Sequence, residues 1–195
     1  MKYANLRLLK TKLYFTVEDV AEAFCVKRAS AWVLCSRYVK AGIFIRLKNN
    51  FYALSERWES LSRLDSFKVA NYLQVPSYVS FMSALSEYGL TTQVQRDFVE
   101  SVSLKRSGRF EAGGKRFNFY KLQKKYYFGF VNNEGVFIAE KEKALIDIMY
   151  LFSFGKYKPD FSSVDFTKFD KAKMRRFLKA YPEKTKQAAR RLCRI

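Results

Sequence analysis

The side chains that could do chemistry in this sequence are mostly cations. The 195 residues include 37 Lys and Arg, 18 Asp and Glu and no histidine, which gives a formal net charge of +19. Such an excess of charge repels itself in a compact chain, and a bound polyanion relieves that repulsion. Nucleic acid is the first candidate partner and an anionic membrane surface is the second. A basic protein without a polyanion partner remains an alternative.

The sequence contains few of the residues and motifs that enzymes commonly use for catalysis. Histidine, the commonest general base near neutral pH, is absent, and Gly113-Gly114 is typical of a turn, not of a phosphate-binding loop. The densest acidic group is Glu140, Glu142 and Asp147. On a helix, however, Glu142 points away from Glu140, and Asp147 lies about two turns further on. We therefore expect capping and surface roles for these acids, and no catalysis, metal site or cofactor.

The three cysteines show no metal-binding pattern. Cys25, Cys35 and Cys193 lack C-x-x-C spacing, and without histidine a zinc site would need an unusual ligand set. We expect small buried or half-buried residues in a reducing cytoplasm. The start of the sequence has no uninterrupted apolar run, so no signal peptide is expected, and no apolar run approaches the length of a membrane span. The sequence therefore predicts a cytoplasmic protein with no membrane partner.

The positive charge is concentrated in three islands. Residues 1–62 carry a net charge of +6, residues 105–126 carry +7 and residues 171–195 carry +9. The two stretches between them come to −1 and −2. Separate basic islands on an otherwise near-neutral chain suggest more than one anion-facing surface.

Helices and strands must position these cations. The sequence of the first basic island, residues 1–62, predicts three helices. Leucines recur at helical spacing over residues 6–13. Thr16 with Asp19 three residues later is the signature of a capping box that opens a second helix. A short turn leads to a third helix over about residues 28–41, with Gly42 placed as its left-handed C-terminal residue.

The third helix has a packing side and a basic side. The packing side, which would meet the two preceding helices, consists of Ala31, Leu34, Cys35 and Tyr38. The free side and its edges present residues predicted to bind DNA: Lys27, Arg28, Trp32, Ser36, Arg37 and Lys40. Trp32 is either part of the core or a contact to a thymine methyl group or a sugar, and Val33 interrupts the polar side. This pattern is typical of a helix-turn-helix, while an ordinary three-helix bundle with a solvated polar face remains open.

A basic hairpin directly after this helix favours the DNA-binding interpretation. Residues 43–54 alternate about Asn49-Asn50, which tolerates the positive φ of a two-residue I′ turn. The predicted cross-strand pairs on one face are Leu47 with Tyr52 and Ile45 with Leu54. The residues predicted to point the other way are Arg46, Lys48 and Phe51. The helix would enter the major groove, and Arg46 and Lys48 would reach flanking phosphates or the minor groove.

Residues 63–195 predict a domain of helices and antiparallel strands, so the whole chain is expected to be α+β. A helix over residues 61–75 ends at Pro76, and Ser77 caps a second helix that Gly89 closes. Strand-like runs follow at 98–106, 116–122, 126–130 and 135–139, with turns at Ser107-Gly108, Gly113-Gly114 and Asn132-Asn133. Further helices are predicted at 139–152, about 170–180 and 184–193. The last is either a phosphate-gripping arm or a solvated helix with Leu192 docked.

Three segments of the sequence are PSYVSFMSALSEYGL (76–90), VSLKR (102–106) and FIAEKEKALIDIMYL (137–151). In their order and spacing they resemble the AbiEi family of antitoxins from type IV toxin–antitoxin systems, which arose in abortive phage infection. The resemblance covers nearly the whole chain, and a winged helix ahead of these segments also fits. The first and third segments are fairly specific together and weak singly. Lys141 stands where the family pattern leads us to expect proline.

The resemblance implies two roles and two domains. A winged helix-turn-helix over residues 1–62 would repress the chain's own operon by binding repeats in promoter DNA. Residues 63–195 would counteract a nucleotidyltransferase toxin, AbiEii, without a stable complex. The protein is expected to be a monomer, or to self-associate weakly on DNA. A DNA- or RNA-binding transcriptional regulator without antitoxin activity remains the alternative.

Overall fold

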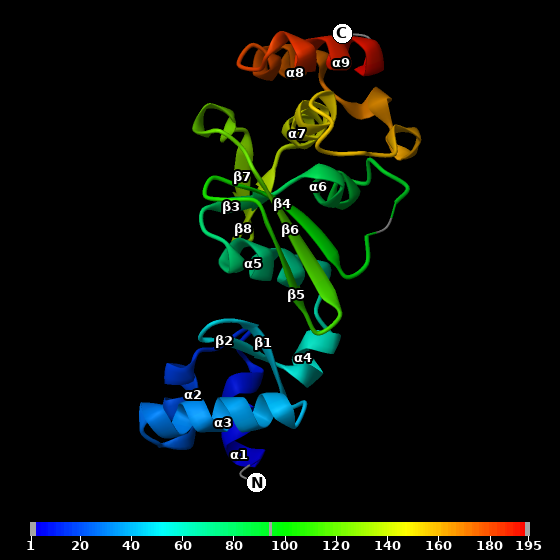
Figure 1. The fold of residues 1–195 in the computed structure, drawn as a ribbon. Helices are drawn as coiled ribbons and strands as arrows, with labels where there is room; N and C mark the ends of the chain where they lie inside the picture. Colours follow the sequence, from blue (N-terminus) through cyan, green and yellow to red (C-terminus); the bar gives the residue numbers. More distant parts are fainter. Residues whose placement is uncertain (1–2, 94, 194–195) are drawn as a thin grey trace. The chain divides into compact units, whose positions relative to one another are not determined.

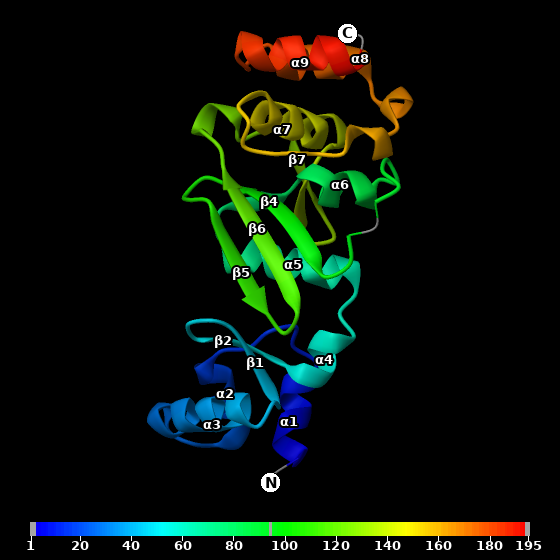
Figure 2. The ribbon, with the colours of Figure 1, turned by 45° about the vertical axis from the view of Figure 1, so that its right-hand side comes forward.

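The computed structural model describes residues 3–93 and 95–193, whose helices and strands form a mixed α+β fold (Figures 1 and 2). Contacts between residues divide the chain into two units. Unit 1 comprises Met1–Val69 and Phe110–Arg116, and unit 2 comprises Ala70–Arg109 and Phe117–Ile195. The division after Val69 falls inside a helix, whereas the sequence predicted a boundary after residue 62.

Unit 1 begins with the three helices that the sequence predicts. They are α1 (Tyr3–Lys10), α2 (Val17–Phe24) and α3 (Arg28–Lys40). The predicted capping box is present at α2, because the Thr16 hydroxyl accepts the Asp19 amide (3.3 Å) and the Asp19 carboxylate accepts the Thr16 amide (2.6 Å). Gly42 follows α3 with a φ of 70°, the left-handed conformation that ends many helices.

A two-stranded hairpin completes the apolar core of these helices. Its strands are β1 (Phe44–Lys48) and β2 (Phe51–Leu54). Phe15, between α1 and α2, joins the hairpin as a single-residue bridge to Tyr52, with N–O distances of 2.8 and 2.9 Å. The Phe15 ring also meets the ring of Phe44 edge-on at 4.8 Å. The hairpin is therefore fixed to the helices by both hydrogen bonds and packing.

The register of the hairpin differs from the predicted one. Phe44 pairs with Leu54, Ile45 with Ala53, Arg46 with Tyr52 and Lys48 with Phe51, and a bulge skips Leu47. The predicted pairs, Leu47 with Tyr52 and Ile45 with Leu54, are therefore wrong. The I′ turn is also wrong, because it needs positive φ at both central residues. Asn50 has a φ of 58°, whereas Asn49 does not adopt a positive φ.

The hairpin buries side chains on both faces near its base, which the alternation argument did not allow for. Phe44 turns to the helices and is 1% exposed. Its neighbour Ile45 lies on the opposite face with its cross-strand partner Ala53. Leu47, the bulged residue, is also buried. With two buried faces, apolar alternation no longer determines the register.

The second buried face of the hairpin packs against the helix that contains Trp58. Trp58 lies in α4 (Ser55–Glu59), a short helix that the sequence analysis missed. The indole N–H donates to the carbonyls of Ala112 (3.2 Å) and Gly113 (3.1 Å), in the predicted Gly113-Gly114 turn. A β-carbon on Gly113 would lie 2.5 Å from Trp58 Nε1, and its φ is +49°. The turn therefore needs glycine at this position.

The three cysteines are free thiols. Cys35 and Cys193 are buried as expected, and burial raises the pKa of Cys35 to about 11 and that of Cys193 to about 12. Cys25 is exposed, so the expectation of a buried or half-buried side chain was wrong for it. The reason is that Cys25 is the left-handed C-cap of α2, with a φ of 52°.

A six-stranded sheet follows, in the order β5-β6-β4-β3-β8-β7. The strands are β3 (Ser77–Val79), β4 (Phe98–Ser103), β5 (Gly108–Ala112), β6 (Lys115–Lys121), β7 (Phe130–Asn133) and β8 (Val136–Ala139). β3 is antiparallel to β4, and β7 is antiparallel to β8, but β3 and β8 are parallel. The sheet is thus mixed and not purely antiparallel. β3 and β8 share a direction because each leads into one of two helices that pack together, α6 and α7.

The helices of this region are α5 (Arg63–Leu73), α6 (Phe81–Glu87), α7 (Lys141–Ser153), α8 (Lys171–Leu178) and α9 (Glu183–Cys193), with 3₁₀ turns η1 (Lys124–Tyr126), η2 (Phe161–Ser163) and η3 (Phe166–Lys168). Figures 1 and 2 show α7 between the sheet and the α8–α9 pair. Residues 142–149 of α7 are all buried. The predicted C-terminal helix is α9, which packs on α7, so its basic sequence belongs to a docked helix.

Several local predictions in this region were wrong. The strand expected at 126–130 begins in the 3₁₀ turn η1 at Tyr126, and only Phe130 belongs to a strand, β7. Ser77 was expected to cap a helix, but it lies in β3, and Ser80 stands at the N-cap of α6 instead. The expected turn at Asn132-Asn133 is the end of β7. The chain turns one step later at Glu134 and Gly135, where φ is 50° and 81°.

Candidate nucleic-acid interface

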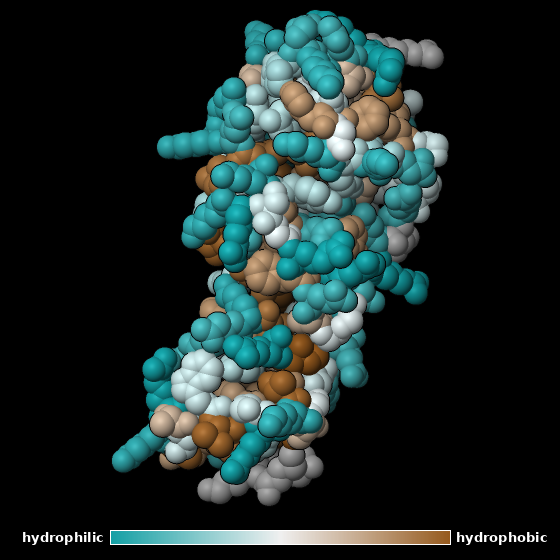
Figure 3. Space-filling model, in the orientation of Figure 1, coloured by the Kyte–Doolittle hydropathy of each residue, from teal (hydrophilic) through white to brown (hydrophobic). Residues whose placement is uncertain are grey.

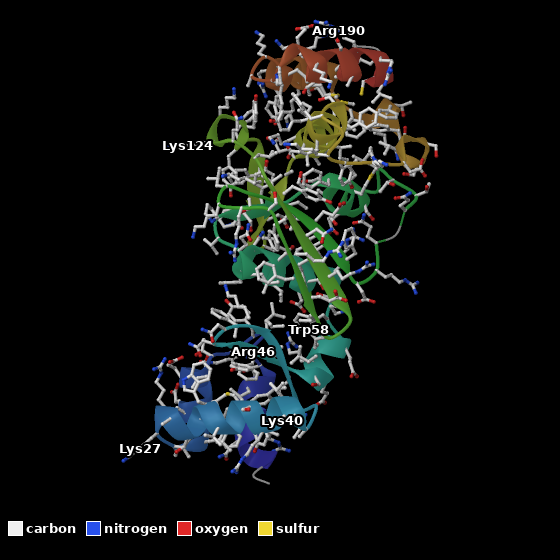
Figure 4. All side chains as sticks on the ribbon, in the orientation of Figure 1. Lys27, Lys40, Arg46, Trp58, Lys124 and Arg190 are labelled. Carbon is white, nitrogen blue, oxygen red and sulfur yellow. The ribbon has the colours of Figure 1, made fainter. Side chains whose placement is uncertain are left out.

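One face of α3 and its N-cap is open to solvent and consists of small and basic side chains. The exposed residues are Lys27, Arg28, Ala29, Ser30, Val33, Ser36, Arg37 and Lys40. The helix has 13 residues, which corresponds to about 20 Å at 1.5 Å per residue. Lys27 and Lys40 lie at opposite ends of it (Figure 4). Cations therefore flank a central strip of small side chains.

The charge of this region has one sign. Residues 27–48 contain six Lys and Arg and no Asp or Glu. Arg37 and Lys40 lie in the last turn of α3, where the helix dipole favours cations. Lys27 and Arg28 lie at the positive end of the same helix, where the dipole disfavours them. An anion bound at this end would relieve that repulsion.

Arg28 is part of a bridge between α2, α3 and the hairpin. Its Nε donates to Glu18 Oε1 at 2.6 Å, and Asn50 Nδ2 donates to the other Glu18 oxygen at 2.9 Å. The side-chain oxygen of Asn50, Oδ1, accepts a hydrogen bond from the backbone amide of Val17 at 2.9 Å. Hydrogen bonds from Asn50 and Arg28 lower the pKa of Glu18 to about 2. Arg28 is therefore oriented by α2, and part of its charge is already compensated.

The two predicted phosphate contacts on the hairpin differ in exposure. Arg46 is exposed, and its Nη2 lies 3.4 Å from Asn49 Oδ1. Lys48 is half-buried, with its Nζ 4.4 Å from the centre of the Phe51 ring. Figure 4 shows Arg46 on the hairpin that follows α3. Arg46 is therefore freer to meet a ligand than Lys48.

Trp32 packs against the core of the three helices and is half-buried, the first of its two predicted roles. The exposed face also includes Ala29 and Ser30, which were not among the residues predicted to bind DNA. Val33, which interrupted the predicted polar side, is 50% exposed. The helical period alone would have found them, because Ala29, Val33 and Ser36 recur at helical spacing. Figure 3 shows hydrophilic and hydrophobic side chains mixed on this surface.

The acids of α7 were expected at the surface, but two of them are buried. Asp147 is 0% exposed and Glu142 is 1% exposed. Asp147 accepts hydrogen bonds from Tyr78 (3.0 Å), Ser80 (2.9 Å) and Tyr181 (3.2 Å), and it forms an ion pair with Lys143. Burial lowers the pKa of Lys143, although the Asp147 charge opposes this shift. Because no member of this cluster reaches solvent, it supports the fold and is not a binding site.

In residues 3–93 and 95–193, no group of three His, Cys, Asp or Glu side chains gathers closely enough to hold a metal ion. No helix in that part of the chain combines the length and apolarity needed to cross a bilayer.

Comparison with known proteins identifies a fold and not a family. No family model matches this sequence, and no curated protein matches it. Among solved structures, the crystal structure of the RV2827C protein from Mycobacterium tuberculosis is similar, with a TM-score of 0.63 at 10% identity. The match covers 98% of this chain and 76% of that chain. The likeness therefore extends over nearly the whole α+β fold of the present protein.

Proposed function

We propose that this chain is a DNA-binding repressor whose unit 1 is a winged helix-turn-helix. The observation that carries the proposal is the run of six cations and no acids over residues 27–48, on an exposed helix and the hairpin after it. The major groove, about 12 Å wide, admits an α-helix. Small side chains in the middle of α3 suit close approach to base edges, where Val33 would contact a thymine methyl group. Cations at its ends suit the flanking phosphates.

The packing of the hairpin supports its role as the wing. Phe15 and Tyr52 hold the base of the hairpin by two backbone hydrogen bonds, and Asn50 holds its tip to the start of α2. A hairpin fixed at both ends keeps Arg46 at a defined position relative to α3. Such preorganisation lowers the entropic cost of binding.

We extend the proposal to an antitoxin that represses its own operon and counteracts a nucleotidyltransferase toxin, on the strength of the AbiEi resemblance. The two most specific resembling segments meet in the buried cluster, where Tyr78 and Ser80 come from the first and Lys143 and Asp147 from the third. These residues then maintain the fold of unit 2. Neutralisation would fall to exposed residues outside the cluster.

The DNA-binding proposal is tested by fluorescence anisotropy on the promoter upstream of the chain's own gene and on a scrambled duplex of equal length. The double variant Arg37→Ala/Lys40→Ala should lose the preference for the promoter and bind both duplexes equally, because base readout needs α3 in the groove. The control Arg96→Ala/Lys168→Ala removes two exposed charges from unit 2 and should keep the preference. A promoter preference that survives in the first variant would refute the proposal.

The same titration, repeated at several salt concentrations, tests the hairpin. Each phosphate contact contributes about −0.9 to the slope of log affinity against log salt. Losing both Arg46 and Lys48 to alanine should therefore make the slope shallower by about two units. An unchanged slope would remove the hairpin from the interface and leave α3 as the only contact.

The antitoxin role is tested by co-expressing the full chain with a nucleotidyltransferase encoded immediately downstream of it. Growth should be rescued by the unaltered chain and by Arg37→Ala/Lys40→Ala, while the latter no longer represses a promoter reporter. Repression without rescue would favour the alternative, a transcriptional regulator without antitoxin activity.

A further inference from the structure

A groove in unit 2 combines aromatic rings with lysine side chains. Its volume is about 520 Å³, and its walls include Tyr120, Lys121, Tyr126, Tyr150, Phe154 and Lys156. We call it the aromatic–lysine groove. The lining comes from the end of β6, from η1, from the end of α7 and from the segment after it, and Pro182 adds the turn before α9. Residues far apart in sequence thus form one surface.

The rings of this groove form a ladder that ends in solvent. Tyr126 is buried and stacks on Tyr181, with ring centres 4.6 Å apart and planes at 14°. Tyr150 follows at 4.8 Å from Tyr126, and Phe154 at 5.3 Å from Tyr150. Phe154 is 44% exposed. The inner rings therefore hold the outer one in place, and the outer one offers a stacking surface.

The lysines around the ladder are available to an anion. Lys121 and Lys156 are exposed in the wall, and Lys124 and Lys125 are exposed on η1. Within the described residues, no carboxylate forms an ion pair with any of these four. Lys184 lies above the Phe154 ring at 5.3 Å. Figure 4 labels Lys124 on η1 and Arg190 on α9, the elements that flank the groove.

We propose that the aromatic–lysine groove binds single-stranded nucleic acid. Exposed rings beside a row of cations are the arrangement by which proteins bind single strands, since bases stack on the rings while cations hold the backbone. Phe154 stacks a base, and Lys121 and Lys156 hold phosphates. A duplex fits this surface poorly, because its base faces are already stacked. This site is separate from the α3 surface proposed above and takes a different form of nucleic acid.

The proposal is tested in an Arg37→Ala/Lys40→Ala background, which weakens binding by the α3 surface. Anisotropy is measured with four labelled ligands of equal length: single-stranded RNA, single-stranded DNA, a duplex and a DNA chain without bases. Phe154→Ala should weaken binding of the single strands at least about fivefold, and should leave the duplex and the base-free chain unchanged. Lys121→Ala/Lys156→Ala should make the single-strand salt slope shallower by about 1.4 units.

The matched control is again Arg96→Ala/Lys168→Ala, which removes two charges of unit 2 outside the groove. It should change neither the affinity for single strands nor the salt slope. Phe154→Leu, with circular dichroism on every variant, separates loss of the ring from loss of the fold. Comparison of the RNA and DNA single strands identifies which one the groove prefers. The proposal would be overturned if Phe154→Ala weakened binding of the base-free chain as much as binding of the single strands. It would also be overturned if the groove variants bound single strands as tightly as the control does.

Discussion

At the scale of single residues, the least expected finding is the buried pair of Lys143 and Asp147. Both are 0% exposed, and the Asp147 oxygens accept from Lys143, Tyr78, Ser80 and Tyr181. A buried charge is tolerated only when it is paired and hydrogen-bonded. Sequence periodicity did not predict this pair, because it assigns charged residues to the surface.

Replacing Lys143 with methionine should destabilise the protein strongly. The substitution keeps the apolar stem but leaves Asp147 as a buried charge without its cation, which costs about 3–5 kcal/mol. Urea denaturation measures the loss. Lys141→Met, on the same helix but 41% exposed at its side chain, is the matched control and should cost less than about 1 kcal/mol. Similar losses for the two variants would argue against a paired cluster.

Glu100 makes a second prediction, which concerns pH. It is 2% exposed, and burial raises its pKa to about 7, against a hydrogen bond from Tyr157 (2.9 Å) that lowers it. Because the folded pKa lies above the unfolded one, the stability from this group is complete below about pH 4.5. It is lost as the pH rises through about 7.

Replacing Glu100 with glutamine should remove this dependence. Between pH 5 and pH 8, the difference in unfolding free energy between Glu100→Gln and the unaltered protein should shift by about 2–3 kcal/mol in favour of glutamine. Urea denaturation at the two pH values measures it, and other titrating groups cancel in the difference. A constant difference would show that Glu100 is ionised in both states at pH 5.

At the scale of elements, local signals predicted the helices well and the sheet poorly. α2, α3 and α9 lie within a few residues of their predicted bounds, since each has a cap or a clear apolar period. β3 and β5 were missed because their residues pair across the sheet with distant segments. The first hairpin packs against α4, whose Trp58 donates to the Ala112 carbonyl of the residue 110–116 segment. Sequence spacing holds no information about such contacts.

The Asn50 side chain joins the hairpin tip to α2 through hydrogen bonds with Val17 and Glu18, at 2.9 Å each. Asn50→Gly keeps the positive φ accessible but loses both bonds, so it should lower stability by about 1–3 kcal/mol. Asn50→Ala should cost about 1 kcal/mol more, because alanine disfavours that φ.

Thermal unfolding of these variants, together with Asn49→Gly as the neighbouring control, measures the effect. Asn49 lies in the same turn without the two bonds to α2, so its substitution should change little. If Asn50→Gly is as stable as the unaltered protein, the hairpin tip is not held by this bridge.

At the scale of the whole molecule, cations take part in two surfaces of different chemistry. The α3 face combines cations with small side chains, whereas the aromatic–lysine groove combines cations with rings. The three basic islands predicted more than one anion-facing surface. They did not predict the groove, because its lining comes from segments that only the fold of unit 2 brings together. The exposed cations of the α3 face, in contrast, were all found from sequence.

The central claim is that the exposed face of α3 contacts duplex DNA, and site-specific photo-crosslinking tests it most directly. A benzophenone amino acid is introduced as Ser36→p-benzoylphenylalanine and, in a separate chain, as Arg96→p-benzoylphenylalanine. The account predicts crosslinks to the promoter duplex from position 36 that unlabelled promoter competes away and scrambled duplex does not, with none from position 96. Crosslinks of equal yield from the two positions, or none from position 36 while the protein still binds the promoter, would contradict it.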